Sequence, residues 1–233
     1  MNTDYCQWLH ETLEKRPLFT YPFNVAALPT NGIYFFYEKG ECCIHHTSSA
    51  RVVRVGTHRD GNFKSRICEH FLLDERKMVF TEDQPAPHDR SIFRKHIGRA
   101  LLNKAGDSYL AVWDLVFTTR KMRDAKRHLR DISKEAEIEA EITRILRDNF
   151  AFRFIEISSQ HQRMGAEGLE KALIGTFAGC PTCGPSEGWL GNYSPKWQIR
   201  NSGLWLIHYL TAAPVTPEHA SMIARAVETG VRP

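Results

Sequence analysis

Residues 32–38 read Gly-Ile-Tyr-Phe-Phe-Tyr-Glu, an apolar and aromatic run that ends in Lys39-Gly40-Glu41. Residues 51–56 read Arg-Val-Val-Arg-Val-Gly, with valine at three of six positions. Aromatic and β-branched side chains fit the pleated, half-buried surface of a sheet. The two runs therefore predict the strands of a hairpin, joined by residues 39–50, a connection longer than a tight turn.

A helix over residues 64–73 is predicted behind the loop formed by residues 57–62. Within this helix Arg66 and His70 are four residues apart, so their side chains share one face. We expect catalytic residues on that face of the helix.

A carboxylate is predicted on a later helix. Residues 150–157 alternate and are rich in aromatic and β-branched side chains, which predicts a third core strand. The following helix, over residues 165–177, places Glu170 beside a buried stripe. The remaining elements expected are helices over residues 3–15, 91–104 and 121–149, a strand over residues 107–117, and a final helix with Thr216 as its N-cap.

The composition describes a globular chain. The 233 residues are 42% hydrophobic and 25% charged, which excludes a disordered or fibrous protein. The formal net charge of +4 is too small to prove a polyanionic partner and does not oppose one. The length favours one elaborated domain.

The location is predicted from two features. No stretch approaches the roughly 18 apolar residues of a membrane span, since Asp114 interrupts the apolar run at 110–117. The first residues lack the basic start and apolar core of an export signal. We therefore expect a cytoplasmic protein without a membrane partner, whose six cysteines are mostly thiols.

The order of Tyr34, Arg66, His70 and Glu170 points to phosphodiester cleavage. A guanidinium stays ionised and offers a fork of donors to phosphate oxygens. A carboxylate binds the hard cations that assist phosphate chemistry, and a histidine of ordinary pKa is suited to proton transfer.

These residues resemble the motifs of the GIY-YIG nuclease family. The resemblance implies an α/β (α+β) fold with a small three-stranded antiparallel sheet flanked by helices, and with two tyrosine motifs on adjacent strands. Tyr34 matches the first tyrosine, Arg66 the helix arginine and Glu170 the metal ligand. His70 matches a histidine that restriction endonucleases of the family place one turn after the arginine.

The implied activity is a DNA endonuclease that uses one Mg²⁺ or Mn²⁺ held by Glu170. Arg66 would stabilise the charge that develops on the phosphate, and Tyr34 or His70 would activate water. Residues 81–149 form a large, mostly helical insertion relative to a minimal member. The chain would then divide into an N-terminal helical extension (1–27), the nuclease domain (28–210) and a C-terminal helix (211–233). Cleavage of both strands would suggest a homodimer.

The second motif departs from the family pattern, because Arg54-Val55-Gly56 stands where the family has Tyr-Ile-Gly. Three interpretations remain open. Tyr34 with His70 suffices to activate water; Arg54 adds phosphate binding at the expense of a proton acceptor; or the site is inactive and the protein only binds DNA.

Contacts to DNA are predicted on several segments. The helix over residues 91–104 has an apolar stripe and basic residues without an acidic one, so it should present a positive face. The basic block at 120–130 is either a solvated helix face or a second contact. The resemblance implies an asparagine after Glu170, a place that either Asn192 or Asn201 would fill. The alternative is that these two asparagines only cap turns. The predicted nucleic-acid contacts are Arg54, Arg94, Lys95, Arg99, Asn192 and Asn201.

Cys180-Pro-Thr-Cys183 has the spacing of half a zinc knuckle. Cys42-Cys43 or His45-His46 would complete four ligands only if the fold brought them across. The alternative is a set of thiols in a loop.

Overall fold

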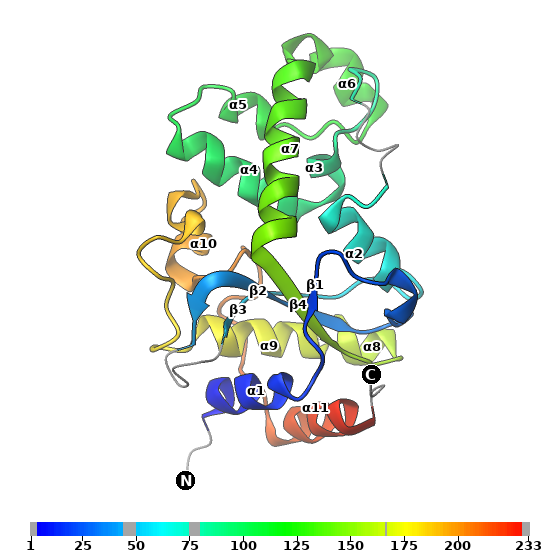
Figure 1. The fold of residues 1–233 in the computed structure, drawn as a ribbon, viewed down its shortest axis with the longest axis vertical. Helices are drawn as coiled ribbons and strands as arrows, with labels where there is room; N and C mark the ends of the chain where they lie inside the picture. Colours follow the sequence, from blue (N-terminus) through cyan, green and yellow to red (C-terminus); the bar gives the residue numbers. More distant parts are fainter. Residues whose placement is uncertain (1–3, 44–49, 75–79, 166, 230–233) are drawn as a thin grey trace.

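The computed structural model describes residues 4–43, 50–74, 80–165 and 167–229. Within them one twisted antiparallel sheet runs across the middle of the molecule, with helices above and below it (Figure 1). Its strands are β1 (Phe19–Thr20), β2 (Ile33–Cys42), β3 (Ala50–Gly56) and β4 (Phe150–Ile155), in the order β1-β4-β2-β3. The predicted fold class and the three predicted core strands are confirmed. The two-residue β1 adds a short fourth strand at the edge.

The register places the tyrosine motif near the start of β2, an inner strand that is paired on both sides. Tyr34 pairs with Gly56 of β3 on one side and with Phe154 of β4 on the other. Phe36 pairs in the same way with Arg54. Because side chains alternate along a strand, Tyr34 and Phe36 face one side of the sheet while Ile33 and Phe35 face the other.

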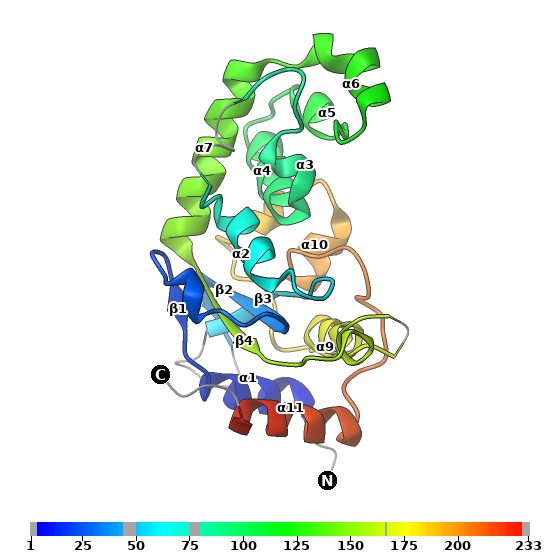
Figure 2. The same cartoon turned by 90° about the vertical axis from the view of Figure 1, so that its right-hand side faces the viewer.

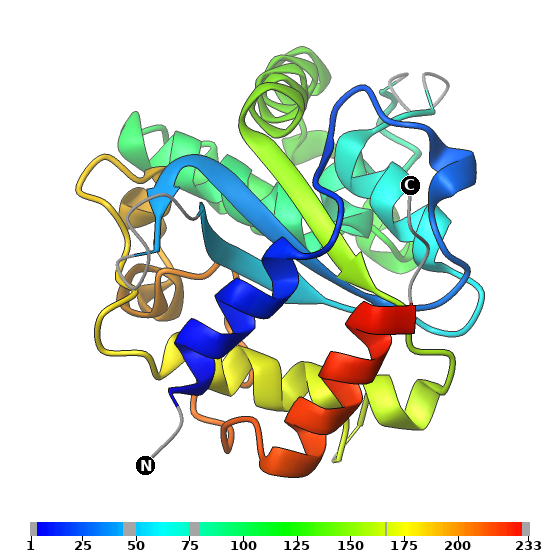
Figure 3. The ribbon, with the colours of Figure 1, turned by 60° about the horizontal axis from the view of Figure 1, so that its bottom comes forward.

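The lower face of the sheet is covered by three helices from distant parts of the sequence. They are α1 (Tyr5–Glu14), α9 (Leu169–Ala178) and α11 (Pro217–Thr229), which lie together beneath the strands (Figure 3). Asp4 caps α1 by accepting bonds from two backbone N–H groups. Apolar stripes of the three helices meet Phe35 and Val55 in one buried cluster, so both ends of the described chain belong to the core.

The upper face is covered by the segment between β3 and β4 and by the last loops. Figure 2 shows α2 (Phe63–Phe71) and α4 (Ile92–Lys104) above the sheet, with α7 (Ile132–Asn149) running up one side. Phe71, Phe93 and Trp205 belong to the cluster around Phe36. The other helices there are α3 (Pro87–Arg90), α5 (Leu110–Trp113), α6 (Arg120–Lys126), η3 (Arg127–Leu129), η4 (Leu190–Tyr193) and α10 (Trp197–Ser202).

Two short helices frame the edge where β2 begins and β3 ends. They are η1 (Val25–Ala27) and α8 (Gln160–Arg163), which precedes α9. Asn24 and Ser159 cap them through side-chain oxygens. The loop that follows Gly56 therefore lies between α2 and the start of α9, the two helices that carry the predicted catalytic residues.

One predicted element is wrong. Residues 107–117 were expected to form a strand because of their apolar and aromatic content, but they form turns and α5. Trp113 of this segment packs on α4, where its indole donates to the Lys95 carbonyl and its ring approaches Gly98. Helix packing, rather than pairing with the sheet, takes up the apolar residues of this segment.

The helices of the described residues give no candidate for a membrane span.

Candidate active site

Tyr34 lies at the centre of a hydrogen-bonded chain on the upper side of the sheet. Its hydroxyl oxygen is 3.1 Å from Nε2 of His70, and Nδ1 of His70 is 2.8 Å from Oγ of Ser91. Ser91 is also the N-cap of α4, where its Oγ accepts from the Arg94 N–H. Strand β2, helix α2 and the start of α4 are thus joined through three buried side chains.

Two glycines allow this arrangement. A Cβ on Gly32 would lie 2.6 Å from the Ile155 carbonyl oxygen of β4. A Cβ on Gly56 would lie 2.4 Å from the Tyr34 hydroxyl oxygen. Real Cβ atoms do not approach other atoms so closely, so both positions require glycine for space. The conformation of the Tyr34 ring therefore depends on Gly56, regardless of whether position 54 carries a tyrosine or an arginine.

Arg54 lies on the same side of the sheet as Tyr34 and is buried. Its Nη1 donates to the Trp205 carbonyl at 2.5 Å, and its guanidinium stacks 4.8 Å from the centre of the Phe93 ring. Burial lowers the pKa of Arg54, while the charges of Tyr34 and Glu170 act to raise it. Among the described residues its Nε has no hydrogen-bond partner. The expectation of a direct nucleic-acid contact by Arg54 is wrong for this conformation, because only 4% of the residue is exposed.

Arg66 projects from α2 and is half-buried. It donates to Glu69 Oε2 at 3.0 Å and to the Arg90 carbonyl at 2.9 Å. Burial opposes its charge, but the interactions with Tyr34 and Glu69 keep the pKa of Arg66 above its usual value. It lines a cavity of about 420 Å³ together with Thr57, Arg59, Asn62 and other residues of the β3–α2 loop. This cation is therefore accessible to a ligand from the solvent side.

His70 is fully buried, which corrects one expected role. Burial lowers the pKa of His70 well below its usual range, and the charges of Arg66, Arg54 and Arg94 lower it further. The imidazole is therefore neutral at pH 7 and does not meet solvent water directly. Any contribution of His70 to water activation has to pass through the Tyr34 hydroxyl.

Glu170 reaches the site from below the sheet, at the first turn of α9. Its Oε1 accepts from the Thr57 N–H at 3.1 Å, just past the end of β3. Burial raises the pKa of Glu170, opposed by the Thr57 N–H and by the charges of Arg54, Arg163 and Arg66. Thr57 in turn donates to the Gly32 carbonyl at 3.0 Å. The motif on β2, the end of β3 and the helix with Glu170 are therefore held together.

Arg163 is a site residue that sequence analysis missed. It is buried, donates to the His58 carbonyl at 2.6 Å and to Thr57 Oγ1 at 3.0 Å, and pairs with Asp60. No spacing or motif in the sequence singles it out. Thr57 was identifiable in principle, because it directly follows the glycine of the second motif.

The remaining predicted contacts lie elsewhere. Arg94 is fully buried and donates two bonds to the Glu139 carboxylate, at 2.9 and 2.6 Å. Lys95 is buried next to Asp89, and Arg99 bonds Asp114 at 2.5 Å. The expectation that Arg94, Lys95 and Arg99 form an exposed positive face is therefore wrong, because acidic residues and carbonyls of the insertion cover this side of α4. All three residues are instead buried ion-pair partners of acidic residues in the insertion.

The two predicted asparagines lie on separate helices. Asn192 of η4 donates to the carbonyls of Ser186 and Glu187, at 2.9 and 3.0 Å, which makes it a cap of its own loop. Asn201 is exposed on α10. The structure thus gives Asn192 the capping role that the sequence had left open.

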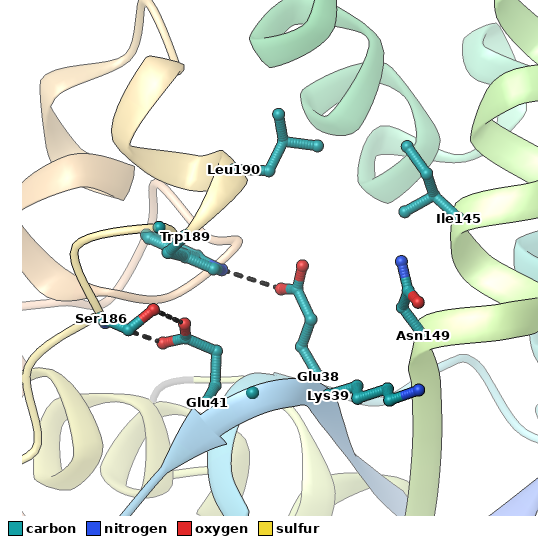
Figure 4. A pocket seen from close by; sticks show the side chains of 10 residues that line it. Glu38, Lys39, Glu41, Ile145, Asn149, Ser186, Trp189 and Leu190 are labelled. Atoms are coloured by element: carbon teal, nitrogen blue, oxygen red, sulfur yellow. Dashed lines mark hydrogen bonds between the residues drawn. The ribbon is translucent and has the colours of Figure 1, made fainter.

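A second cavity, of about 380 Å³, opens near the opposite end of β2 (Figure 4). Glu38 points into it and accepts bonds from the indole nitrogens of Trp189 and Trp205, at 2.8 and 2.9 Å. Burial raises the pKa of Glu38 to about 7. Glu41 is held beside it by Ser186 and Arg51. This cavity is separate from the one lined by Arg66.

A family model for the GIY-YIG domain matches residues 5–231 of the chain. The chain belongs to the GIY-YIG family. Searches of curated proteins and of solved structures found no match. GIY-YIG proteins are generally metal-dependent endonucleases acting on DNA, so this domain is of the nuclease type.

The residues at this GIY-YIG site fit the divalent metal that the family implies. Glu170 uses Oε1 for the Thr57 N–H, and within the described residues its Oε2 has no hydrogen-bond partner. A single carboxylate with phosphate and water oxygens is a donor set that suits Mg²⁺. Burial also makes the charge of Glu170 costly without a cation, as its raised pKa shows.

Proposed function

We propose that this protein is a DNA endonuclease that hydrolyses phosphodiester bonds at the site formed by Tyr34, Arg66, His70 and Glu170. The observation that supports the proposal best is the meeting of these four side chains from β2, α2 and α9 at one end of the sheet. Three hydrogen bonds hold the elements that carry these side chains together. Tyr34 bonds His70 of α2, Glu170 of α9 bonds Thr57 after β3, and Thr57 bonds Gly32 before β2.

In this proposal Glu170 would hold Mg²⁺ or Mn²⁺, which would supply positive charge at the scissile phosphate. Arg66 binds a non-bridging phosphate oxygen. To do so it exchanges its bonds with Glu69 and the Arg90 carbonyl for the phosphate, and the cavity beside it leaves room for that movement. A planar guanidinium with two donors suits the trigonal bipyramidal transition state.

Tyr34 is the residue proposed to meet the attacking water. Only 1% of it is exposed here, so the movement of Arg66 toward phosphate would also open its hydroxyl. We assign the Nδ1–H tautomer to His70, donating to Ser91, so that Nε2 accepts the Tyr34 O–H. The Tyr34 oxygen then keeps a lone pair for a proton of water. Because the pKa of His70 is low, the proton that Nε2 takes from Tyr34 passes back to Tyr34, and the proton lost by water ends on the leaving oxygen.

Arg54 acts in this proposal without touching the substrate. Its charge lies near Tyr34 and Glu170 and helps to keep the carboxylate ionised. It thereby fulfils a positioning role on the strand where the family has its second tyrosine. Exposed Asn201 remains a proposed DNA contact, and a homodimer remains the proposed form for cutting both strands, to be checked by light scattering. A cytoplasmic location and the three-part division at residues 27 and 210 also remain proposals.

The second candidate is a DNA-binding protein without activity. It is favoured by one observation, the replacement of the second tyrosine by a buried arginine that is held by the Trp205 carbonyl. In that case the site would bind phosphate through Arg66 without cleavage.

Cleavage of supercoiled plasmid and of branched DNA, with Mg²⁺, Mn²⁺ or EDTA, separates the two candidates. We expect metal-dependent cutting that Glu170→Ala and Arg66→Ala each reduce by about 10²-fold or more. Exposed Glu167 and exposed Arg225 of α11 provide matched controls, so Glu167→Ala and Arg225→Ala should cut like the unmodified protein. DNA binding without cutting under any metal would overturn the endonuclease proposal and support the binding protein.

A further inference from the structure

Four cysteines from three separate segments meet below the sheet, away from Glu170. Cys6 lies in the first turn of α1, Cys43 directly follows β2, and Cys180 and Cys183 lie in the loop after α9. Helices α1 and α9 lie side by side on this face (Figure 3). Cys6, Cys43 and Cys183 are buried, and Cys180 is half-buried.

The sulfur atoms are close to one another. Sγ of Cys43 is 3.4 Å from Sγ of Cys183. The sulfur atoms of Cys6 and Cys183 lie, with a ring nitrogen of His10, within 4.8 Å of one another. Cys180 is close enough to Cys6 for a side-chain hydrogen bond. Cys183 thus lies next to both Cys43 and Cys6, and Cys180 lies next to Cys6, so the four thiols form one connected cluster.

This spacing fits a tetrahedral metal better than a disulfide. With zinc–sulfur bonds of about 2.3 Å, two sulfurs of a tetrahedral site lie about 3.8 Å apart. A disulfide would require about 2.05 Å between them. The sequence Cys180-Pro-Thr-Cys183 also has the two-residue spacing with which one chain segment supplies two zinc ligands. Cys42-Cys43 was one pair expected to complete the four ligands, and Cys43 is the member of that pair that lies beside Cys183. The other expected pair, His45-His46, lies outside the described residues.

His10 is excluded as a direct ligand by its own hydrogen bonds. Its Nδ1 is 2.8 Å from the Cys6 carbonyl oxygen, to which it donates, and its Nε2 accepts from the Val52 N–H at 3.3 Å. Nδ1 is also 3.8 Å from Cys6 Sγ. In this geometry the imidazole is a neutral neighbour that orients the sulfur of Cys6, as outer-shell groups do around metal ligands.

We propose that Cys6, Cys43, Cys180 and Cys183 bind one structural Zn²⁺. Each thiol that binds loses its proton to solvent, and the thiolate becomes a ligand. The N-terminal end of α1 adds a positive backbone dipole next to Cys6.

The zinc ion would join three segments that the sequence separates widely: α1, the end of β2 and the loop after α9. Four protein ligands leave no open coordination position, so this ion is structural and takes no part in hydrolysis. It would fix the C-terminal end of α9, the helix whose first turn carries Glu170. The proposal does not depend on the endonuclease proposal, because it concerns metal content rather than cleavage.

The test is metal analysis of the full chain purified without chelators from zinc-supplemented medium. We expect about one zinc per chain, and a cobalt-substituted protein with the intense visible absorption of tetrahedral cobalt thiolate. Cys43→Ser and Cys183→Ser should lose most of the zinc. Cys42→Ser is the matched control, since Cys42 is exposed and adjacent to Cys43, and it should keep the full content.

A second measurement covers variants that fail to fold. Chelation of the unmodified protein should lower its melting temperature, and added zinc should restore it. The proposal is overturned if the folded unmodified protein contains no zinc and gives no cobalt thiolate spectrum. It is likewise overturned if mass spectrometry finds Cys43 and Cys183 joined by a disulfide, or if Cys42→Ser loses as much zinc as Cys43→Ser.

Discussion

The ring of Tyr34 lies against the backbone of Gly56, so close that a Cβ atom there would be 2.4 Å from the phenolic oxygen. The two residues face each other across the β2–β3 pairing. The glycine of the second motif is therefore required by the first tyrosine, which explains how it persists beside Arg54.

Gly56→Ala should displace Tyr34 and break its bond with His70. We expect a loss of about 1–3 kcal/mol in unfolding free energy, since overpacking in a well-packed site has that cost, and a larger loss of cleavage. Urea unfolding and plasmid cleavage measure the two effects. Gly188→Ala is the control, because no atom of the described residues lies within 4 Å of a Cβ there. Normal cleavage by Gly56→Ala would contradict the role given to the Tyr34 ring.

Arg54→Met should shift the pH dependence of cleavage. The variant keeps much of the side-chain volume beside Phe93 but removes a charge that lowers the pKa of Glu170. The carboxyl would then ionise at higher pH, so the acidic limb of the pH–rate profile should move upward. Arg51→Met is the control: it also removes a buried strand arginine, one paired with Glu41 at the far end of β3. A shared shift in both variants would mean that destabilisation alone is responsible.

Arg94→Ala should destabilise the fold strongly. Arg94 and Glu139 are both buried, and Arg94 with His88 holds the pKa of Glu139 below its usual value despite burial. Removing one partner leaves the other charge unpaired in the interior, which costs about 3–5 kcal/mol. Chemical denaturation of Arg94→Ala measures this. Arg144→Ala, at a solvent-exposed pair with Glu141, should cost far less, because water screens the pair. Equal losses would refute the buried role.

Glu38→Gln should flatten the dependence of stability on pH. Because the folded-state pKa of Glu38 is raised to about 7, the protonated side chain stabilises the fold below its unfolded pKa, and that stability is lost as pH rises through 7. The loss is at most about 3.5 kcal/mol, from roughly 1.4 kcal/mol per pKa unit over the rise from 4.5 to about 7. Glutamine still accepts from both indoles, so the variant should be more stable than the unmodified protein at pH 8. Melting curves from pH 5 to 8 decide this.

The strands and most helices could be predicted from sequence because their patterns are local. Strand β4 shows alternation that matches its burial, and Ser91 and Thr216 mark helix starts with capping side chains. The segment around Trp113 could not be predicted in this way. Its aromatic content suits a strand as well as a helix turn, and only its packing on α4 distinguishes them.

The site was predictable only where a motif existed. Tyr34, Arg66, His70 and Glu170 belong to a spacing that resembles a family, whereas Arg163 and Ser91 act through contacts between segments far apart in the chain. The prediction of an exposed basic face on α4 was wrong for a related reason. The charges that neutralise it, Glu139 and Asp114, lie 45 and 15 residues beyond their partners Arg94 and Arg99, so composition within the helix gave no sign of them.

Helix α7 passes into strand β4 without an intervening loop, since Asn149 ends the helix and Phe150 begins the strand. An 18-residue helix, about 27 Å long, is thus a rigid arm whose base is hydrogen-bonded to the strand of Tyr34. The upper helices have no hinge there. A duplex that touched both the tip of this arm and the cavity lined by Arg66 would meet two surfaces whose relative position the protein fixes in advance.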